Sequence, residues 1–145
     1  MSRGFTLIEL LVVFLIIGTA LAIAVPLLGP VSSETRVKSD IREFSAFLRE
    51  ARAEAISNNQ DVVVTVDTTR RTYATSSAQN KGKFAKEVKL LVTAAAVEQI
   101  NSTTAGFRFF PDGSSTGGEV SLEAGSAHYL VKVEWLTGRV STDAR

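Results

Sequence analysis

Glu9 places a carboxylate inside an apolar run, GFTLIELLVVFLIIG, at residues 4–18. An ionised side chain in hydrocarbon is costly, so this charge needs a partner if the segment enters a membrane. A cut between Gly4 and Phe5 would create an ammonium group four residues before Glu9, about one helical turn away. In a bundle of such helices, the ammonium of one chain can pair with the carboxylate of its neighbour. That pairing would favour assembly and fix the axial register.

Other interpretations of this N-terminus stay open. Residues 10–28 carry no charge, which is about the length that crosses a bilayer core of roughly 30 Å. The segment is therefore consistent with a simple anchor oriented by Arg3. Small residues within 20–24 also fit the cleavage site of a secretory signal peptide. Neither interpretation gives a reason for Glu9, and a protonated Glu9 hidden in the bilayer gives none either.

The run RGFTLIELL at residues 3–11 resembles the class III signal of type IV pilins and type II secretion pseudopilins. The resemblance implies that residues 1–4 are a leader removed by a prepilin peptidase. It implies that the new terminus, Phe5, is N-methylated and that Glu9 pairs with a neighbouring amine during filament growth. Residues 5–28 would then form the transmembrane and filament-core helix, with a cytoplasmic N-terminus. Pilins commonly have a proline near Pro26, so a bend in the helix is expected there.

A second, amphipathic helix is predicted at about residues 31–59, at the start of a periplasmic globular domain that spans residues 29–145. Polar residues Ser32 and Ser33 can cap its start. Apolar residues then recur at steps of four and three, typical of a helix with one buried face. The stripe consists of Val37, Ile41, Phe44, Leu48, Ala51 and Ala55.

The remainder of the chain is predicted to be β-rich, because β-branched and alternating runs are separated by Gly, Ser, Asn and Asp. The predicted strands cover residues 61–67, 72–75, 84–93, 107–110, 119–123 and 129–135, with a last short one at 139–141. Residues 76–82 are predicted to form a loop. Residues 93–100 are ambiguous, because Ala94, Ala95 and Ala96 could start a helical turn. These elements predict an α+β protein whose antiparallel β domain covers the apolar stripe of the helix. Trp135 is expected in the core.

A second resemblance covers the rest of the chain. The runs EARAEAI at 50–56, FPDGSSTGG at 110–118 and VEWLTGRV at 133–140 are similar to those of H-type minor pseudopilins of type II secretion. The resemblance implies a pilin-like domain of two β-sheets. It also implies a structural subunit at the tip of the periplasmic pseudopilus that helps folded proteins cross the outer membrane. The implied partners are the other minor pseudopilins, the major pseudopilin, prepilin peptidase, the inner membrane and the secreted substrate.

One glycine-rich segment is a candidate contact loop. Its residues are Asp112, Gly113, Ser114, Ser115, Thr116, Gly117 and Gly118. The composition predicts a conformationally demanding hairpin loop. An exposed contact loop is the alternative, because Gly and Ser permit close approach of a partner backbone. The segment lacks the lysine and the spacing of a phosphate-binding P-loop.

Catalytic and metal chemistry find little support. The chain has no cysteine, which excludes disulfides and thiolate sites. His128 is the only histidine, and it has no positioned partner for nucleophilic catalysis. The acidic residues of the C-terminal half match no calcium loop. We therefore expect no catalytic residue, no metal, no cofactor and no enzyme activity.

Charge is balanced overall, with a net charge of +1. Nucleic acid is not an expected partner, because DNA binding needs a basic stripe and only the cluster at residues 70–89 is a candidate. Basic residues dominate 68–97 and acidic residues dominate 98–135. This pattern predicts either two solvated surfaces or complementary contacts between neighbouring subunits. Two rival functions stay open: a type IV minor pilin in fimbrial biogenesis or DNA uptake, and a periplasmic enzyme with a cleaved signal peptide.

Overall fold

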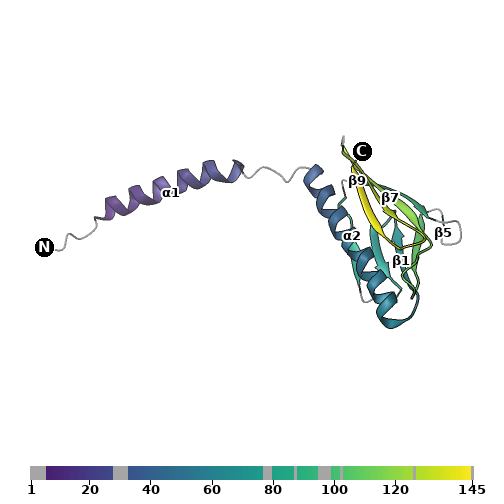
Figure 1. Ribbon diagram of the computed structural model, residues 1–145. Helices are drawn as coiled ribbons and strands as arrows, with labels where there is room; N and C mark the ends of the chain where they lie inside the picture. The colour runs from purple at the N-terminus through teal and green to yellow at the C-terminus, as the bar shows by residue number, and fades with distance from the viewer. Residues whose placement is uncertain are drawn as a thin grey trace. The chain divides into compact units, whose positions relative to one another are not determined.

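The computed structural model describes residues 6–27, 33–76, 80–86, 88–94, 99–101, 103–125 and 127–144. The chain divides into two compact units, with the boundary between residues 31 and 32. The first contains helix α1 (Leu7–Leu27), and the second contains helix α2 (Ser33–Asn58) and the strands (Figure 1). The predicted leader at residues 1–4 and the predicted terminus Phe5 lie outside the described residues.

Helix α1 is apolar apart from Glu9 and Thr19, and it begins at a polar cap. The backbone N–H of Glu9 bonds to the carbonyl of Thr6 at 3.1 Å and to its hydroxyl at 3.3 Å, so Thr6 satisfies groups that a helix start leaves open. Farther along, the Thr19 hydroxyl donates to the carbonyls of Leu15 and Ile16. The helix includes Pro26 and ends one residue later. Among the described residues, no helix combines the length and hydropathy needed to cross a membrane.

Helix α2 matches the predicted amphipathic helix to within about two residues at either end. It ends through Asn59, which has a φ of 51°, and the Gln60 N–H bonds back to the Ala55 carbonyl at 3.2 Å. This is a Schellman-type end, in which a left-handed residue lets the chain turn back onto the last carbonyls. All six residues of the predicted apolar stripe are buried. The sequence period therefore predicted the buried face of α2 correctly.

Two antiparallel sheets cover that face. The first has the order β3-β2-β1-β6-β5 and the second the order β4-β7-β8-β9. The strands are β1 (Val62–Asp67), β2 (Thr72–Thr75), β3 (Lys81–Lys83), β4 (Lys89–Ala94), β5 (Gln99–Asn101), β6 (Thr104–Phe109), β7 (Gly118–Ala124), β8 (Ala127–Val133) and β9 (Val140–Ala144). Helix α2 contacts strands of both sheets, and β9 lies close to it in Figure 1. The α+β class and the two sheets are confirmed.

An aromatic cluster joins α2 to the first sheet. The ring of Phe44 meets those of Tyr73 and Phe84 edge-on, with centroids 5.0 and 5.2 Å apart. Phe47 adds a further edge contact to Tyr73 at 4.8 Å. Such pairs add about 0.5–1.5 kcal/mol each beyond the area they bury. Burial also raises the pKa of the Tyr73 phenol above its ordinary value.

Two predictions, one of a strand and one of a loop, need correction. The strand predicted at 84–93 is observed only from Lys89. Before it, Asp40 accepts a hydrogen bond from the Ala85 N–H at 2.7 Å, and the Arg71 guanidinium donates to the carbonyls of Ala85 and Val88. The Phe84 N–H also bonds to the Arg71 carbonyl at 2.9 Å, so this segment is held by side chains and by one backbone bond instead of a strand ladder. Within the loop predicted at 76–82, β3 pairs with β2 as an edge strand.

Candidate assembly and contact sites

Glu9 lies in the first turn of α1 and is exposed. Within the described residues, its carboxylate has no hydrogen-bond or ion-pair partner. The positive end of the helix dipole favours a negative charge there, but only by a fraction of the cost of placing the charge in hydrocarbon. A low-dielectric setting would therefore leave this carboxylate in need of a cation from outside the described part of the chain.

The apolar side chains around Glu9 are also uncovered. Leu7 is 84% exposed, Ile8 70% and Phe14 66%. A large exposed apolar surface marks a site for another protein or for lipid. Since these side chains surround α1 and do not lie on one stripe only, the segment can be buried on all sides. Glu9 and the apolar surface are thus together on one helix, as the sequence predicts. Pro26 lies within the last turn of the same helix, and the predicted bend stays a prediction.

The candidate contact loop first doubles back on β6. The Gly113 N–H bonds to the Phe110 carbonyl at 2.9 Å, and the Phe110 N–H bonds to the Ser114 carbonyl at 3.0 Å. Ser115 then bridges to Phe109, and the Thr116 N–H reaches the Arg108 carbonyl at 3.0 Å. Unlike a simple hairpin loop, the segment next crosses to β7, in the other sheet. It therefore connects the two sheets as well as turning the chain.

This loop is held by α2 and by the segment after β8. Arg52 on α2 donates from its Nε atom to the Gly113 carbonyl at 2.9 Å. The Ser115 N–H donates to the Trp135 carbonyl at 2.8 Å. Gly117 has a φ of 74° and lies so close that an added Cβ would stand 3.0 Å from the Cβ of Trp135. Its glycine is needed both for backbone conformation and for close approach.

Asp112 is the one exposed residue of the seven in the loop. The Ser114 hydroxyl and backbone N–H both donate to its Oδ1 atom, at 2.6 and 2.9 Å. The hydroxyl bond is the larger cause that holds the pKa of Asp112 below its ordinary value. Gly113, Ser115 and Gly117 are buried. A contact role of this loop stays a prediction, and Asp112 is the side chain most available for it.

Two further predictions have different outcomes. Trp135 was expected in the core, but its side chain is 66% exposed. It belongs to the turn after β8, where its backbone carbonyl accepts the hydrogen bond from the Ser115 N–H. His128 is exposed on β8, and its Nδ1 atom lies 3.4 Å from Glu123. Within the described residues, no group of three or more acidic, histidine or cysteine side chains is placed to hold a metal ion.

Arg52 and Gly138 are site residues that sequence reasoning missed. Gly138 has a φ of 61°, and an added Cβ would lie 2.3 Å from the Gly113 carbonyl oxygen and 2.8 Å from the Arg52 Nε atom. Arg52 and Gly138 are far apart in sequence, but both pack against the Gly113 carbonyl. We call this contact of Arg52, Gly113 and Gly138 the joint between α2 and the loop. A signal for Gly138 was the Thr-Gly pair in VEWLTGRV. The charged face of α2 gave no signal that distinguishes Arg52 from its neighbours.

Comparisons with known proteins match both parts of the chain. Residues 40–137 match the profile of a family described as type II transport protein GspH, and residues 1–25 match the prokaryotic N-terminal methylation motif. A protein of Xanthomonas campestris pv. campestris, named type II secretion system protein H, is 29% identical over 138 residues. That alignment covers 95% of this chain and 81% of the relative.

Solved structures share the fold at low sequence identity. The minor pseudopilin EpsH from the type 2 secretion system of Vibrio cholerae gives a TM-score of 0.59 at 15% identity, covering 75% of this chain and 97% of that one. The type IV minor pilin FimU of Pseudomonas aeruginosa gives a TM-score of 0.61 at 14% identity, covering 80% and 97%. The fold is therefore shared by both kinds of filament protein and does not separate them.

Proposed function

Because the chain belongs to the family of type II transport protein GspH, we propose that it is a minor pseudopilin at the tip of the type II secretion pseudopilus. There it would assist the export of folded proteins across the outer membrane. The family match extends over most of the globular unit, and the methylation motif covers the N-terminal segment. The pilin-like fold is consistent with this assignment, while the match to a type II transport family favours it over the type IV pilin alternative.

The observation that carries the assembly mechanism is that Glu9 has no partner among the described residues and lies on a helix whose apolar side chains, where described, are exposed. After cleavage behind Gly4, the methylated amino group of Phe5 on one subunit would pair with Glu9 of its neighbour. Each charge removes the penalty that hydrocarbon imposes on the other. Exposed apolar side chains of α1 would at the same time pack against neighbouring helices. Pairing along the helix axis would then set how far each new subunit is drawn out of the membrane.

Location and partners follow from the same proposal. The apolar segment would anchor the precursor in the inner membrane with a cytoplasmic N-terminus and a periplasmic globular unit. Prepilin peptidase would process it there. Other minor pseudopilins and the major pseudopilin would be its neighbours in the filament, and the secreted protein a further contact. The protein would act as a structural subunit and not as an enzyme.

A pair of leucine variants on one helix tests this function. Glu9→Leu removes the carboxylate, while Thr19→Leu removes a polar side chain whose hydroxyl, among the described residues, bonds to carbonyls of its own helix. Both are expressed in cells that lack the native gene, and secretion and copurification with the other pseudopilins are measured. We expect Glu9→Leu to lose both and Thr19→Leu to keep both. Normal secretion and normal recovery of partners with Glu9→Leu would contradict the mechanism.

A further inference from the structure

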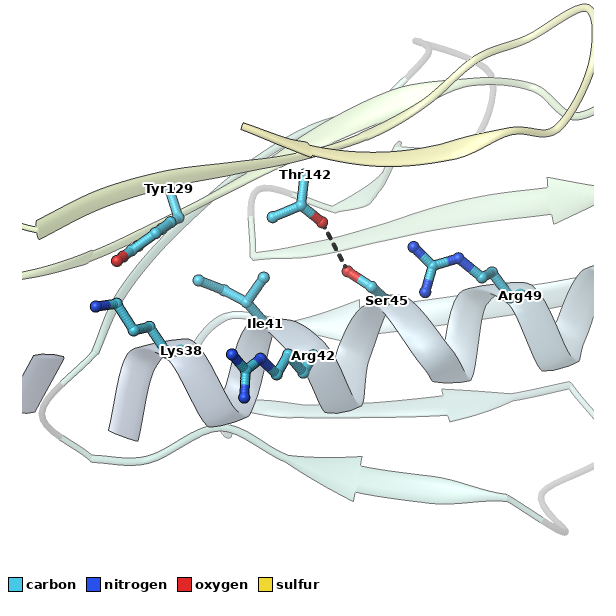
Figure 2. Close-up of a pocket in the computed structure, with 7 residues that line it drawn as sticks. All are labelled: Lys38, Ile41, Arg42, Ser45, Arg49, Tyr129 and Thr142. Atoms are coloured by element: carbon cyan, nitrogen blue, oxygen red, sulfur yellow. Dashed lines mark hydrogen bonds between the residues drawn. The ribbon is translucent and has the colours of Figure 1, made fainter. Parts of the chain in front are cut away.

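A groove separates helix α2 from the second sheet at its β9 edge. It has a volume of about 400 Å³ and is lined by Lys38, Ile41, Arg42, Ser45, Arg49, Tyr129 and Thr142 (Figure 2). Among these residues, the hydroxyls of Ser45 and Thr142 share a hydrogen bond of 3.2 Å that links α2 to β9. The lining side chains thus come from α2 on one side and from β8 and β9 on the other. Neither element forms the groove alone.

Three cations line this groove, and the two arginines leave much of their hydrogen-bonding capacity unused. Lys38 pairs with Glu34 at 2.8 Å. The Arg49 Nη2 atom makes only a long hydrogen bond, 3.5 Å, to the Val140 carbonyl. Within the described residues, the Arg42 guanidinium has no hydrogen-bond or ion-pair partner. A guanidinium presents donors in a planar fork that suits a carboxylate. The groove therefore offers an anion-binding surface that no described residue of this chain fills.

The other exposed flank of α2 has the opposite charge. Glu43 and Glu50 line a second hollow, beside β2 and β3. Glu54 follows at the spacing that keeps it on the same flank of a helix. Glu50 is bonded to Asn80 at 3.2 Å. Lys81 also lines this hollow and reduces the negative charge without removing it.

This separation of charge suits a subunit that has a different neighbour on each side. Subunits of a helical filament meet through heterologous contacts, in which one face of a subunit touches a different face of the next. A basic flank and an acidic flank on one helix provide two such faces. Charge complementarity of this kind selects partners and registers and speeds association.

We propose that the groove between α2 and β9 binds a carboxylate-bearing surface of the adjacent pilin-like subunit, with Arg42 and Arg49 as its anchors. This inference rests on the proposed function, because it requires neighbouring subunits in a filament. It adds the face used and the chemistry of the partner. Arg42 and Arg49 are two helical turns apart along the groove, so they would bind two carboxylates spaced along a neighbouring helix or strand.

Zero-length coupling tests the contact in the full-length protein within cells that secrete. Arg42→Lys keeps the positive charge and supplies the primary amine that a carbodiimide joins to a carboxylate in direct contact. Lys83, exposed on the edge strand β3, serves as the internal control. Coupled products are digested and mapped by mass spectrometry. We expect an amide between residue 42 and an Asp or Glu of a pilin-like subunit. Products that join residue 42 only to proteins of another class, or only within its own chain, would overturn the proposal.

Charge reversal provides the second measurement. The variant with Arg42→Glu and Arg49→Glu should lose recovery of neighbouring subunits and lose secretion. The matched variant with Lys83→Glu and Lys86→Glu should keep both. A third variant, with Arg42→Lys and Arg49→Lys, should also keep both. Accumulation of each variant to the wild-type level shows that folding is intact.

The outcomes separate the contact from the function. Suppose that secretion requires the chain but persists in the variant with Arg42→Glu and Arg49→Glu. That result would overturn the groove contact and leave the proposed function standing. Secretion that persists without the chain altogether would overturn the proposed function itself.

Discussion

Two glycines with the same backbone conformation provide a quantitative test of the joint between α2 and the glycine-rich loop. Gly125 and Gly138 both have a φ of 61°. An added Cβ at Gly125 meets no atom of the described residues within 4 Å, whereas at Gly138 it would lie 2.3 Å from the Gly113 carbonyl oxygen. Replacing each by alanine therefore imposes the same left-handed backbone cost, but only Gly138→Ala adds a steric conflict.

The magnitudes follow from this difference. A non-glycine residue in the left-handed region costs about 1–2 kcal/mol, and alanine recovers about 0.4–1 kcal/mol by restricting the unfolded chain. Gly125→Ala should thus lower the free energy of unfolding by about 1 kcal/mol. Gly138→Ala must also displace the Gly113 carbonyl from Arg52, and a hydrogen bond to a charged group contributes about 1.5–3 kcal/mol. Its total loss should be about 3 kcal/mol or more.

Pulse proteolysis of the full chain in detergent, repeated across a urea series, measures both values by the fraction of the globular unit that survives a brief digestion. The midpoint should shift clearly more for Gly138→Ala than for Gly125→Ala. Equal losses, within about 0.5 kcal/mol, would refute the reasoning, because the joint at Gly113 and Arg52 would then carry no stability.

Three further outcomes are expected. Phe44→Ala should cost about 3–5 kcal/mol of unfolding free energy in the same urea series, because it empties the centre of the aromatic cluster; a loss under 1 kcal/mol would contradict that packing. Trp135→Ala should change the unfolding free energy by no more than about 0.5 kcal/mol, since the side chain is exposed, and a large loss would show that it is a core residue after all. The lowered pKa of Asp112 means that its ionised form stabilises the fold above its unfolded pKa of about 3.9 and that this contribution is lost as the pH falls through the folded value. Urea midpoints of wild type and Asp112→Asn should therefore converge below about pH 4, and a difference that does not change with pH would exclude this role of the carboxylate.

The helices could be predicted from sequence because their signals are local. The apolar stripe of α2 depends on a period of three and four residues, and every predicted member is buried. β1 was equally clear, since Val62, Val64 and Val66 alternate and all face the core. Wherever one face of an element is buried along its whole length, the pattern alone indicates which side is buried.

Elements that depend on distant side chains could not be predicted in the same way. Phe84 and Val88 are buried, and their apolar character predicted a strand. That segment is instead held by a hydrogen bond that Asp40 accepts and by two that Arg71 donates, and both residues lie elsewhere in the sequence. The strand β3 was missed because its residues, Lys81–Lys83, have no apolar alternation.

The candidate sites also differ in whether their signal is local in the sequence. Glu9 could be selected from sequence because one charge in an apolar run conflicts with its surroundings. The groove at Arg42 and Arg49 could not, since its far wall consists of Tyr129 and Thr142 from strands at the other end of the chain. Residue type alone placed Trp135 in the core. Whether one aromatic side chain is buried depends instead on where the chain places it, and Trp135 lies in an exposed turn.

The mass of the N-terminal peptide of the protein isolated from its own cells tests most directly whether Glu9 has a sister chain's amine as its partner. A first residue of Phe5 carrying one added methyl group is the expected result, because cleavage behind Gly4 creates that amine. A chain that still starts at Met1, or one that starts near Val25 after removal of the whole apolar run, would contradict it.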